Sequence, residues 1–123
     1  MKTTIISLML SLVAIGTVRA APARGEASWY GETHRGRWMA NGKPFNPDRL
    51  TAASWFYPLG SRVKVSLNAP GKTRKEVTVV ITDRGPAMDL VRDGRIIDLS
   101  RAAFAKLEAT DRGLVQVSLR RLK

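Results

Sequence analysis

The stretch that most constrains the fold is an apolar strand that runs directly into an aspartate. Residues 77–81 are apolar on both faces apart from Thr78, and Thr82-Asp83-Arg84 follows them without a break. Gly85-Pro86 then ends the strand, and a second apolar pair, Ile96-Ile97, leads into Asp98. Two carboxylates about fifteen residues apart are therefore held at the ends of predicted elements. Rigid scaffolds often present chemistry from such positions.

Further short alternating segments precede and follow this strand, and a loop rich in turn-forming residues covers 32–50. The predicted strands are Glu26–Gly31, Arg62–Leu67, Glu76–Thr82 and Leu114–Leu122, with a short apolar stretch at Thr51–Ala53. Only Ser100–Ala109 has helical spacing, and either Asp98 or Ser100 is placed to cap it. Many short strands, frequent turns and one short helix predict a mainly β fold, a small barrel.

The first twenty residues have the pattern of a secretory signal. Lys2 supplies the positive charge, 5–15 the apolar stretch, and Val18-Arg19-Ala20 the cleavage site. The alternative is an uncleaved anchor, but the apolar stretch is shorter than the ~20 residues that a membrane span needs. We therefore expect a signal at 1–20, a leader at 21–25 and one domain at 26–123, located in the periplasm or outside the cell.

The charge of the chain is strongly positive. Cleavage would leave 103 of the 123 residues and, through the loss of Lys2 and Arg19, lower the net charge from +11 to +9. A basic domain of this size favours a polyanionic partner, and export argues against nucleic acid. The alternative is a solvated basic surface with no partner. The chain has no Cys, so the fold depends on its core, and a lipoprotein anchor is excluded.

Several ordered motifs resemble the rare lipoprotein A family of septal-ring lytic transglycosylases. The motifs are Ala27-Ser28-Trp29-Tyr30-Gly31, Ala40-Asn41-Gly42, Leu50-Thr51-Ala52-Ala53, Pro58-Leu59-Gly60, Asp83-Arg84-Gly85-Pro86 and Ile97-Asp98-Leu99-Ser100. The resemblance implies a six-stranded double-psi β-barrel. It also implies cleavage of the peptidoglycan bond between N-acetylmuramic acid and N-acetylglucosamine, with a 1,6-anhydro product.

The resemblance assigns the chemistry to Asp83, as acid and base, with Asp98 as the second carboxylate. Protonation of a glycosidic oxygen requires a carboxyl whose pKa is raised, by burial or by a neighbouring carboxylate. Simpler roles are also open at this point: Asp98 could only cap the helix, and Asp83 could only order the Gly85-Pro86 turn. Arg84 could pair with either carboxylate.

The substrate-binding residues implied by motif and loop position are Tyr30, Trp38, Asn41, Lys43, Ser54, Trp55 and Arg84. Exposed indoles in polar loops can stack on sugar rings. The chain departs from the family twice, since Lys43 replaces a Glu and Ser54 replaces a His, and His34 is a possible substitute for that His.

Three functions therefore remain open. The first is a monomeric, exported lytic transglycosylase that acts on peptidoglycan glycan strands without a metal or other cofactor and without stable membrane insertion. The second is a non-catalytic, expansin-like module that binds or loosens the cell wall. The third is a protein-binding barrel, such as a secreted inhibitor, which the sequence neither supports nor excludes.

Overall fold

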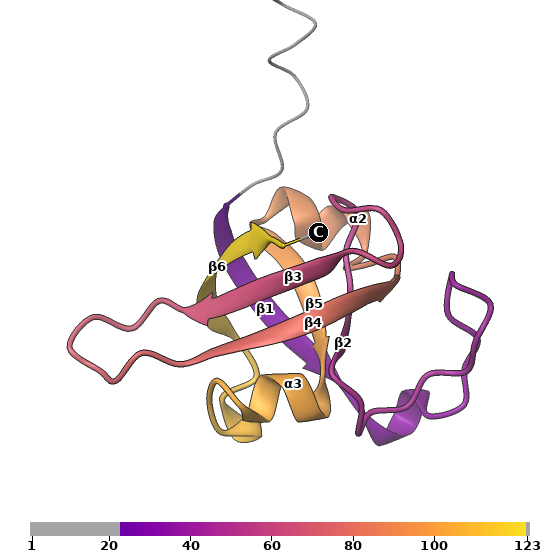
Figure 1. The fold of residues 1–123 in the computed structure, drawn as a ribbon, viewed down its shortest axis with the longest axis horizontal. Helices are drawn as coiled ribbons and strands as arrows, with labels where there is room; N and C mark the ends of the chain where they lie inside the picture. Colours follow the sequence, from indigo (N-terminus) through magenta and orange to yellow (C-terminus); the bar gives the residue numbers. More distant parts are fainter. Residues whose placement is uncertain (1–22, 123) are drawn as a thin grey trace, which may run out of the picture.

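The predicted strands close into a barrel in the computed structural model, which describes residues 23–122 (Figure 1). The strands are β1 (Arg24–Tyr30), β2 (Thr51–Ala53), β3 (Arg62–Leu67), β4 (Glu76–Asp83), β5 (Arg95–Ser100) and β6 (Val115–Arg121). Their order around the barrel is β1-β5-β2-β4-β3-β6. The expected barrel of six strands is confirmed.

The pairing mixes directions, because β1 runs parallel to β5 and β2 parallel to β4 while the remaining neighbours are antiparallel. Alternation along each strand sends β-branched and aliphatic side chains inward. Fully buried residues that line the interior are Ala27, Ala52, Val63, Val65, Val79, Ile81, Ile97, Leu99 and Val117. The core is thus built from the alternation visible in the sequence.

Two short α-helices accompany the barrel in the described residues, where the sequence predicted one. The predicted helix at 100–109 is shorter than expected, with α3 spanning Arg101–Ala105. The second, α2 (Met88–Arg92), has no buried residues, so it left no apolar periodicity to detect. Single 3₁₀ turns occur at η1 (Glu32–His34) and η2 (Thr110–Arg112).

Ser100 settles which residue caps α3. Its hydroxyl accepts a hydrogen bond from the Ala103 amide at 3.2 Å and donates one to the Arg49 carbonyl at 2.5 Å. Ser100 is fully buried. Asp98 is therefore not needed as the cap, and its carboxylate is available for another role.

The expected signal at 1–20 and residues 21–22 of the expected leader lie outside the described residues. β1 begins at Arg24, two residues before the expected start of the domain at Glu26. Within residues 23–122 no helix has the length and apolar character needed to cross a membrane.

We predict that Ser100→Ala lowers the free energy of unfolding by about 1–3 kcal/mol, because it removes a helix cap and the hydroxyl that donates to the Arg49 carbonyl. Urea denaturation would measure this loss. Ser66→Ala is the control, since Ser66 is only half-buried and its hydroxyl makes a long 3.4 Å bond to Glu76. The control should change stability by less than about 0.5 kcal/mol. Equal effects of the two substitutions would contradict the capping role.

Candidate active site

The two aspartates meet across the short strand β2. Ala53 is paired with Asp83 on β4 at one edge and with Asp98 on β5 at the other. Strands in a sheet lie about 4.8 Å apart, so the two Cα atoms are roughly 10 Å from each other. Ser28 on β1 is paired with Asp98 and extends this row by one strand. The barrel therefore places both carboxylates in one row on its surface.

Asp98 lies in a tight, partly buried environment. The Ser28 hydroxyl donates a short hydrogen bond to its Oδ1. Gly85 passes directly over it, since a Cβ at that position would lie 3.3 Å from Asp98 Oδ2. Burial raises the pKa of Asp98 above its ordinary value, while the Ser28 hydrogen bond and the charges of Arg95 and His34 lower it. The net effect is a carboxyl that retains its proton to a higher pH than usual.

Asp83 holds a loop rather than only its own turn. The Arg84 and Ala40 amides donate to its Oδ1 at 2.8 and 2.9 Å. The backbone N–H of the neighbouring Asn41 donates to the Thr82 carbonyl at 3.2 Å. The end of β4 thereby fixes the loop that carries Trp38, Asn41 and Lys43.

The Tyr30 ring connects the two carboxylates to the loop around η1. Its hydroxyl is buried and has no hydrogen-bond partner among residues 23–122. Burial raises the pKa of this phenol, and the negative charges of Asp83 and Asp98 raise it further. The ring stacks on Phe45 with centroids 4.3 Å apart and meets the His34 ring edge-on at 5.5 Å. A neutral hydroxyl is thus held near both carboxylates.

An ion-pair network fixes η1 to α3. Arg35 pairs with Glu32 at 2.7 Å and with Asp48 at 3.0 Å, and Arg101 pairs with the same two carboxylates. The hydrogen bond from Arg35 lowers the pKa of Glu32 to about 2. The network is exposed, so it contributes little to the stability of the fold. It links η1, which carries His34, to α3.

A groove of about 700 Å³ runs along the loop that Asp83 fixes, and neither Asp83 nor Asp98 is among the residues that line it. Asn41 and Lys43 line it together with Thr51 and Thr82. The Thr82 side chain is only 8% exposed, and the hydroxyls of both threonines have no partner in the described part of the chain. The groove therefore offers the Lys43 cation and the Asn41 side chain to a polar ligand, while the two threonine hydroxyl oxygens are buried behind its surface.

The two loop tryptophans are exposed, as their polar surroundings predicted. Trp38 is 76% exposed on the projecting loop. Trp55 is 46% exposed, and its Nε1 donates to the Pro86 carbonyl at 2.6 Å, which fixes the orientation of the ring. Trp29, by contrast, is partly buried against Phe104 and donates to the Thr110 carbonyl.

Ser54 and Arg84 occupy positions that differ from the expectation of direct substrate contact. Ser54 is fully buried, and its hydroxyl accepts a hydrogen bond from the Phe56 amide. Arg84 points away from Asp83 and donates through Nη1 to the carbonyls of Ser54 and Tyr57 at 2.8 and 2.7 Å. Both residues fold the 54–57 segment that presents Trp55.

Sequence reasoning did not select Ser28, Gly85 or Thr82. Ser28 had a usable signal, because strand alternation places it on the same face as Tyr30. Gly85 was interpreted only as a strand breaker, and its approach to Asp98 depends on tertiary geometry.

Comparison with known proteins agrees with this geometry. A family model described as lytic transglycolase matches residues 22–119, which is most of the chain. The chain belongs to this lytic transglycolase family. The barrel is accordingly the double-psi β-barrel of the RlpA-like members, as the motifs implied.

Two curated relatives illustrate the similarity. The probable endolytic peptidoglycan transglycosylase RlpA of Synechocystis sp. is 43% identical over 95 residues, covering 77% of this chain and 27% of the relative. The endolytic peptidoglycan transglycosylase RlpA of Campylobacter jejuni is 36% identical over 110 residues, covering 89% and 36%. The chain thus spans only about a third of the length of these members of the lytic transglycolase family.

A solved structure with the same barrel is that of the Streptomyces papain inhibitor. It is 27% identical, with a TM-score of 0.56 over 83% of this chain and 100% of that one. The fold of the lytic transglycolase family is therefore shared with a protein described as a protease inhibitor, so the activity has to be argued from the site.

We predict that Asp98→Asn raises the thermal unfolding midpoint at pH 7 and leaves it nearly unchanged at pH 3. Burial raises the pKa of Asp98, so the folded state binds this proton more tightly than the unfolded state. Its contribution to stability is therefore fully present below the ordinary value near 3.8 and is lost as the pH rises through the raised pKa. Calorimetry at the two pH values measures the effect.

The matched control for this prediction is Asp89→Asn, because Asp89 is exposed on α2. It should show no comparable gain at pH 7. A stabilisation by Asp98→Asn that is as large at pH 3 as at pH 7 would contradict a burial-raised pKa.

Proposed function

We propose that this domain cleaves peptidoglycan glycan strands as a lytic transglycosylase. The observation that supports it best is the row formed by Asp98, Ala53 and Asp83, which sets two carboxylates on either side of one residue. One of these carboxyls has a pKa that burial raises, as an acid for glycosidic oxygen requires. The curated relatives, described as peptidoglycan transglycosylases, make the glycan strand the substrate to test.

The reaction assigns one step to each carboxylate. Asp98 donates its proton to the glycosidic oxygen, and the bond from that oxygen to the sugar's anomeric carbon breaks. The 6-hydroxyl of the same sugar forms the new bond to this carbon, and Asp83 accepts its proton. No water is consumed, the product carries a 1,6-anhydro ring, and proton exchange with solvent restores both carboxyls. These roles reverse the expectation that Asp83 is the acid, because it is Asp98 whose pKa burial raises.

The surroundings of the carboxylates support binding of a sugar chain. The groove lined by Asn41, Lys43 and Thr82 runs along the loop whose Ala40 amide is held by Asp83. The exposed ring faces of Trp38 and Trp55 are suited to stacking on sugars. In this proposal Ser54 and Arg84 act indirectly, by presenting Trp55. We further propose that the domain works as an exported monomer without a cofactor.

A second candidate function is a non-catalytic module that binds the cell wall. The observation that favours it is Lys43, a cation in the groove at the position where the family carries a Glu. A positive charge near the site favours ionised carboxylates, and an ionised acid cannot protonate the substrate. This module would bind sacculi without releasing products.

We predict that Asp83→Asn and Asp98→Asn each lower the release of anhydro-muropeptides from purified sacculi by about 100-fold or more, since general acid–base catalysis contributes factors of this size. Mass spectrometry of the soluble products measures the release, and Asp89→Asn is the control for a lost carboxylate outside the site. Wild-type release by either site variant would contradict the mechanism. Salt-sensitive binding to sacculi with no product from the unaltered protein would establish the wall-binding module instead.

A further inference from the structure

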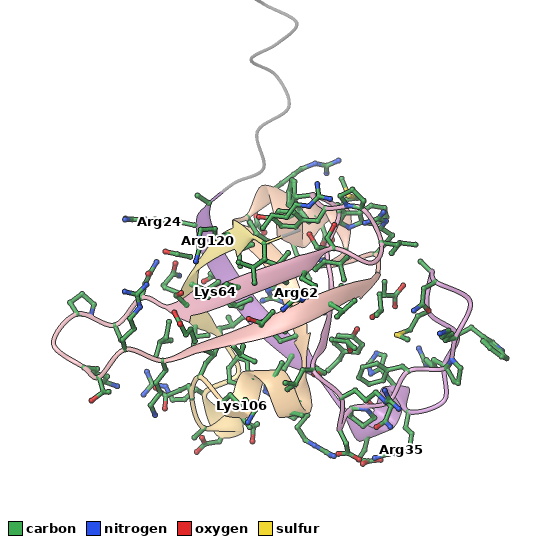
Figure 2. The ribbon with its side chains drawn as sticks, viewed as in Figure 1. Arg24, Arg35, Arg62, Lys64, Lys106 and Arg120 are labelled. Atoms are coloured by element: carbon green, nitrogen blue, oxygen red, sulfur yellow. The ribbon has the colours of Figure 1, made fainter. Side chains whose placement is uncertain are left out.

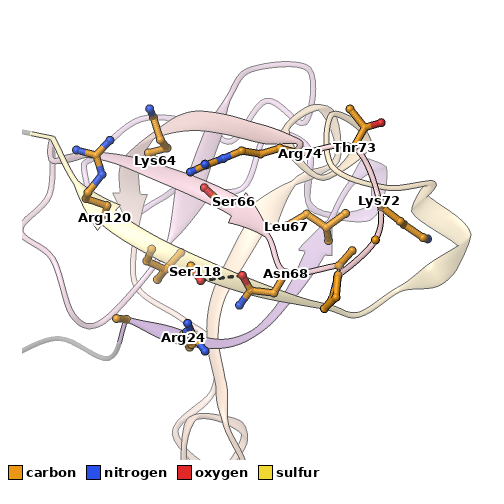
Figure 3. A pocket seen from close by; sticks show the side chains of 15 residues that line it. Arg24, Lys64, Ser66, Leu67, Asn68, Lys72, Thr73, Arg74, Ser118 and Arg120 are labelled. Atoms are coloured by element: carbon orange, nitrogen blue, oxygen red, sulfur yellow. Dashed lines mark hydrogen bonds between the residues drawn. The ribbon is translucent and has the colours of Figure 1, made fainter.

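A second groove lies on the outer surface of the barrel, away from the carboxylates. It has a volume of about 690 Å³ and is bounded by β3, β6, the start of β1 and the loop at 68–74 (Figure 3). The hairpin between β3 and β4 projects beyond the barrel (Figure 1), and its loop forms one end of the groove. None of the candidate site residues lines this groove.

Basic side chains surround this groove. Arg24, Lys64, Arg74 and Arg120 line it, and Figure 2 shows three of them, Arg24, Lys64 and Arg120, close together on one face. Glu76 pairs with Lys64 and with Arg74, each at 3.4 Å. Arg24 and Arg120 make no ion pair with any residue in 23–122. The basic groove therefore carries an excess of positive charge within the folded domain.

The register of the sheet makes this arrangement costly for the isolated protein. Lys64 on β3 lies directly opposite Arg120 on β6 in an antiparallel pair. Like charges directly opposite each other on neighbouring strands destabilise a sheet. An anion bound between Lys64 and Arg120 would remove this repulsion, so the electrostatic energy favours anion binding at this position.

The floor of the basic groove adds neutral polar groups. Ser118 donates to Asn68 Oδ1 at 2.8 Å, and Ser66, paired with Ser118 across β3 and β6, lies beside them (Figure 3). The side-chain nitrogen of Asn68, Nδ2, remains as a donor, while the backbone amide of Asn68 donates to the Gln116 carbonyl. A phosphate has oxygens directed to several sides, so it can accept from a guanidinium at the rim and from a neutral donor on the floor at once.

We propose that the basic groove binds a linear phosphodiester polymer that lacks aromatic bases. The projecting hairpin would hold a flat bilayer away from the floor, which favours a single chain. None of the fifteen residues that line the groove is aromatic, so it provides no stacking platform of the kind that single-stranded nucleic acids use. A flexible polyol phosphate chain satisfies both conditions.

The position of the basic groove makes it a tether rather than part of the active site. Glu76 at its edge and Asp83 in the site lie at opposite ends of β4, roughly 23 Å apart in an extended strand. A polymer held in the groove would keep the domain on an anionic matrix while the carboxylates act on another chain. Binding here goes beyond the proposed cleavage and does not depend on it.

The test measures binding of poly(glycerol phosphate) to the purified protein by calorimetry at 50 mM and 200 mM NaCl. The double substitution Arg24→Gln with Arg120→Gln should weaken binding at least about tenfold and reduce its salt dependence, because fewer phosphates are neutralised. The control, Arg92→Gln with Lys106→Gln, removes the same charge from exposed positions outside the groove. It should weaken binding less than about twofold.

Thermal unfolding checks the electrostatic argument independently. Arg120→Gln relieves the repulsion with Lys64, so the groove variant should unfold at the same temperature as the unaltered protein or higher. Equal loss of binding in the groove and control variants would overturn the proposal, since only net charge would then matter. Tighter binding to polyglutamate, to phosphatidylglycerol vesicles or to single-stranded DNA would also overturn it.

Discussion

The fold of the site depends on one three-residue strand. β2 is inserted between β5 and β4, and its last residue, Ala53, is paired with a carboxylate-bearing residue on each side. Ala53 is itself buried, and a Cβ added to Gly85 would lie 3.3 Å from the Ala53 Cβ, so the absence of that atom lets Gly85 cover Ala53 and Asp98 closely. A shift of β2 by one residue would turn its side chains to the opposite faces and separate the two aspartates from this common neighbour.

The sequence predicted the strands because their apolar residues alternate, and it predicted the exposed tryptophans because their loops are polar. The meeting of Asp83 and Asp98 was expected only through the family resemblance, because no local pattern in the chain predicts it. That meeting arises from strand order and register, with β2 placed between strands distant in sequence. The burial of Ser54 could not be predicted either, because the local sequence does not distinguish a buried serine next to the exposed Trp55 from a serine on the surface.

Local patterns also left two alternatives that only packing could decide. Asp98 and Ser100 were both acceptable caps by spacing, and the structure gives the cap to Ser100. Lys43 could have pointed anywhere from its loop, and it lines the groove that runs along the loop fixed by Asp83. The short α2 escaped detection because a five-residue helix with no buried face has no periodic signal.

The domain thus separates two kinds of charge on one small barrel. Partly buried carboxylates occupy the ends of β4 and β5, while cations gather over β3, β6 and the start of β1. This division keeps the basic groove from lowering the pKa of the buried acid, because charges separated by more than about 10 Å are largely screened in salt. Acid chemistry and attachment to a polyanion are therefore compatible in the same fold.

The barrel buries Asp98 so that its pKa is raised, and pairs both Asp98 and Asp83 with Ala53. Carbon-13 NMR titration of the aspartate side chains tests it directly. We predict a midpoint for Asp98 above its ordinary value near 3.8, and a further rise in Ser28→Ala, because the Ser28 hydrogen bond lowers the pKa of Asp98. A midpoint at or below the ordinary value, unchanged by Ser28→Ala, would contradict it.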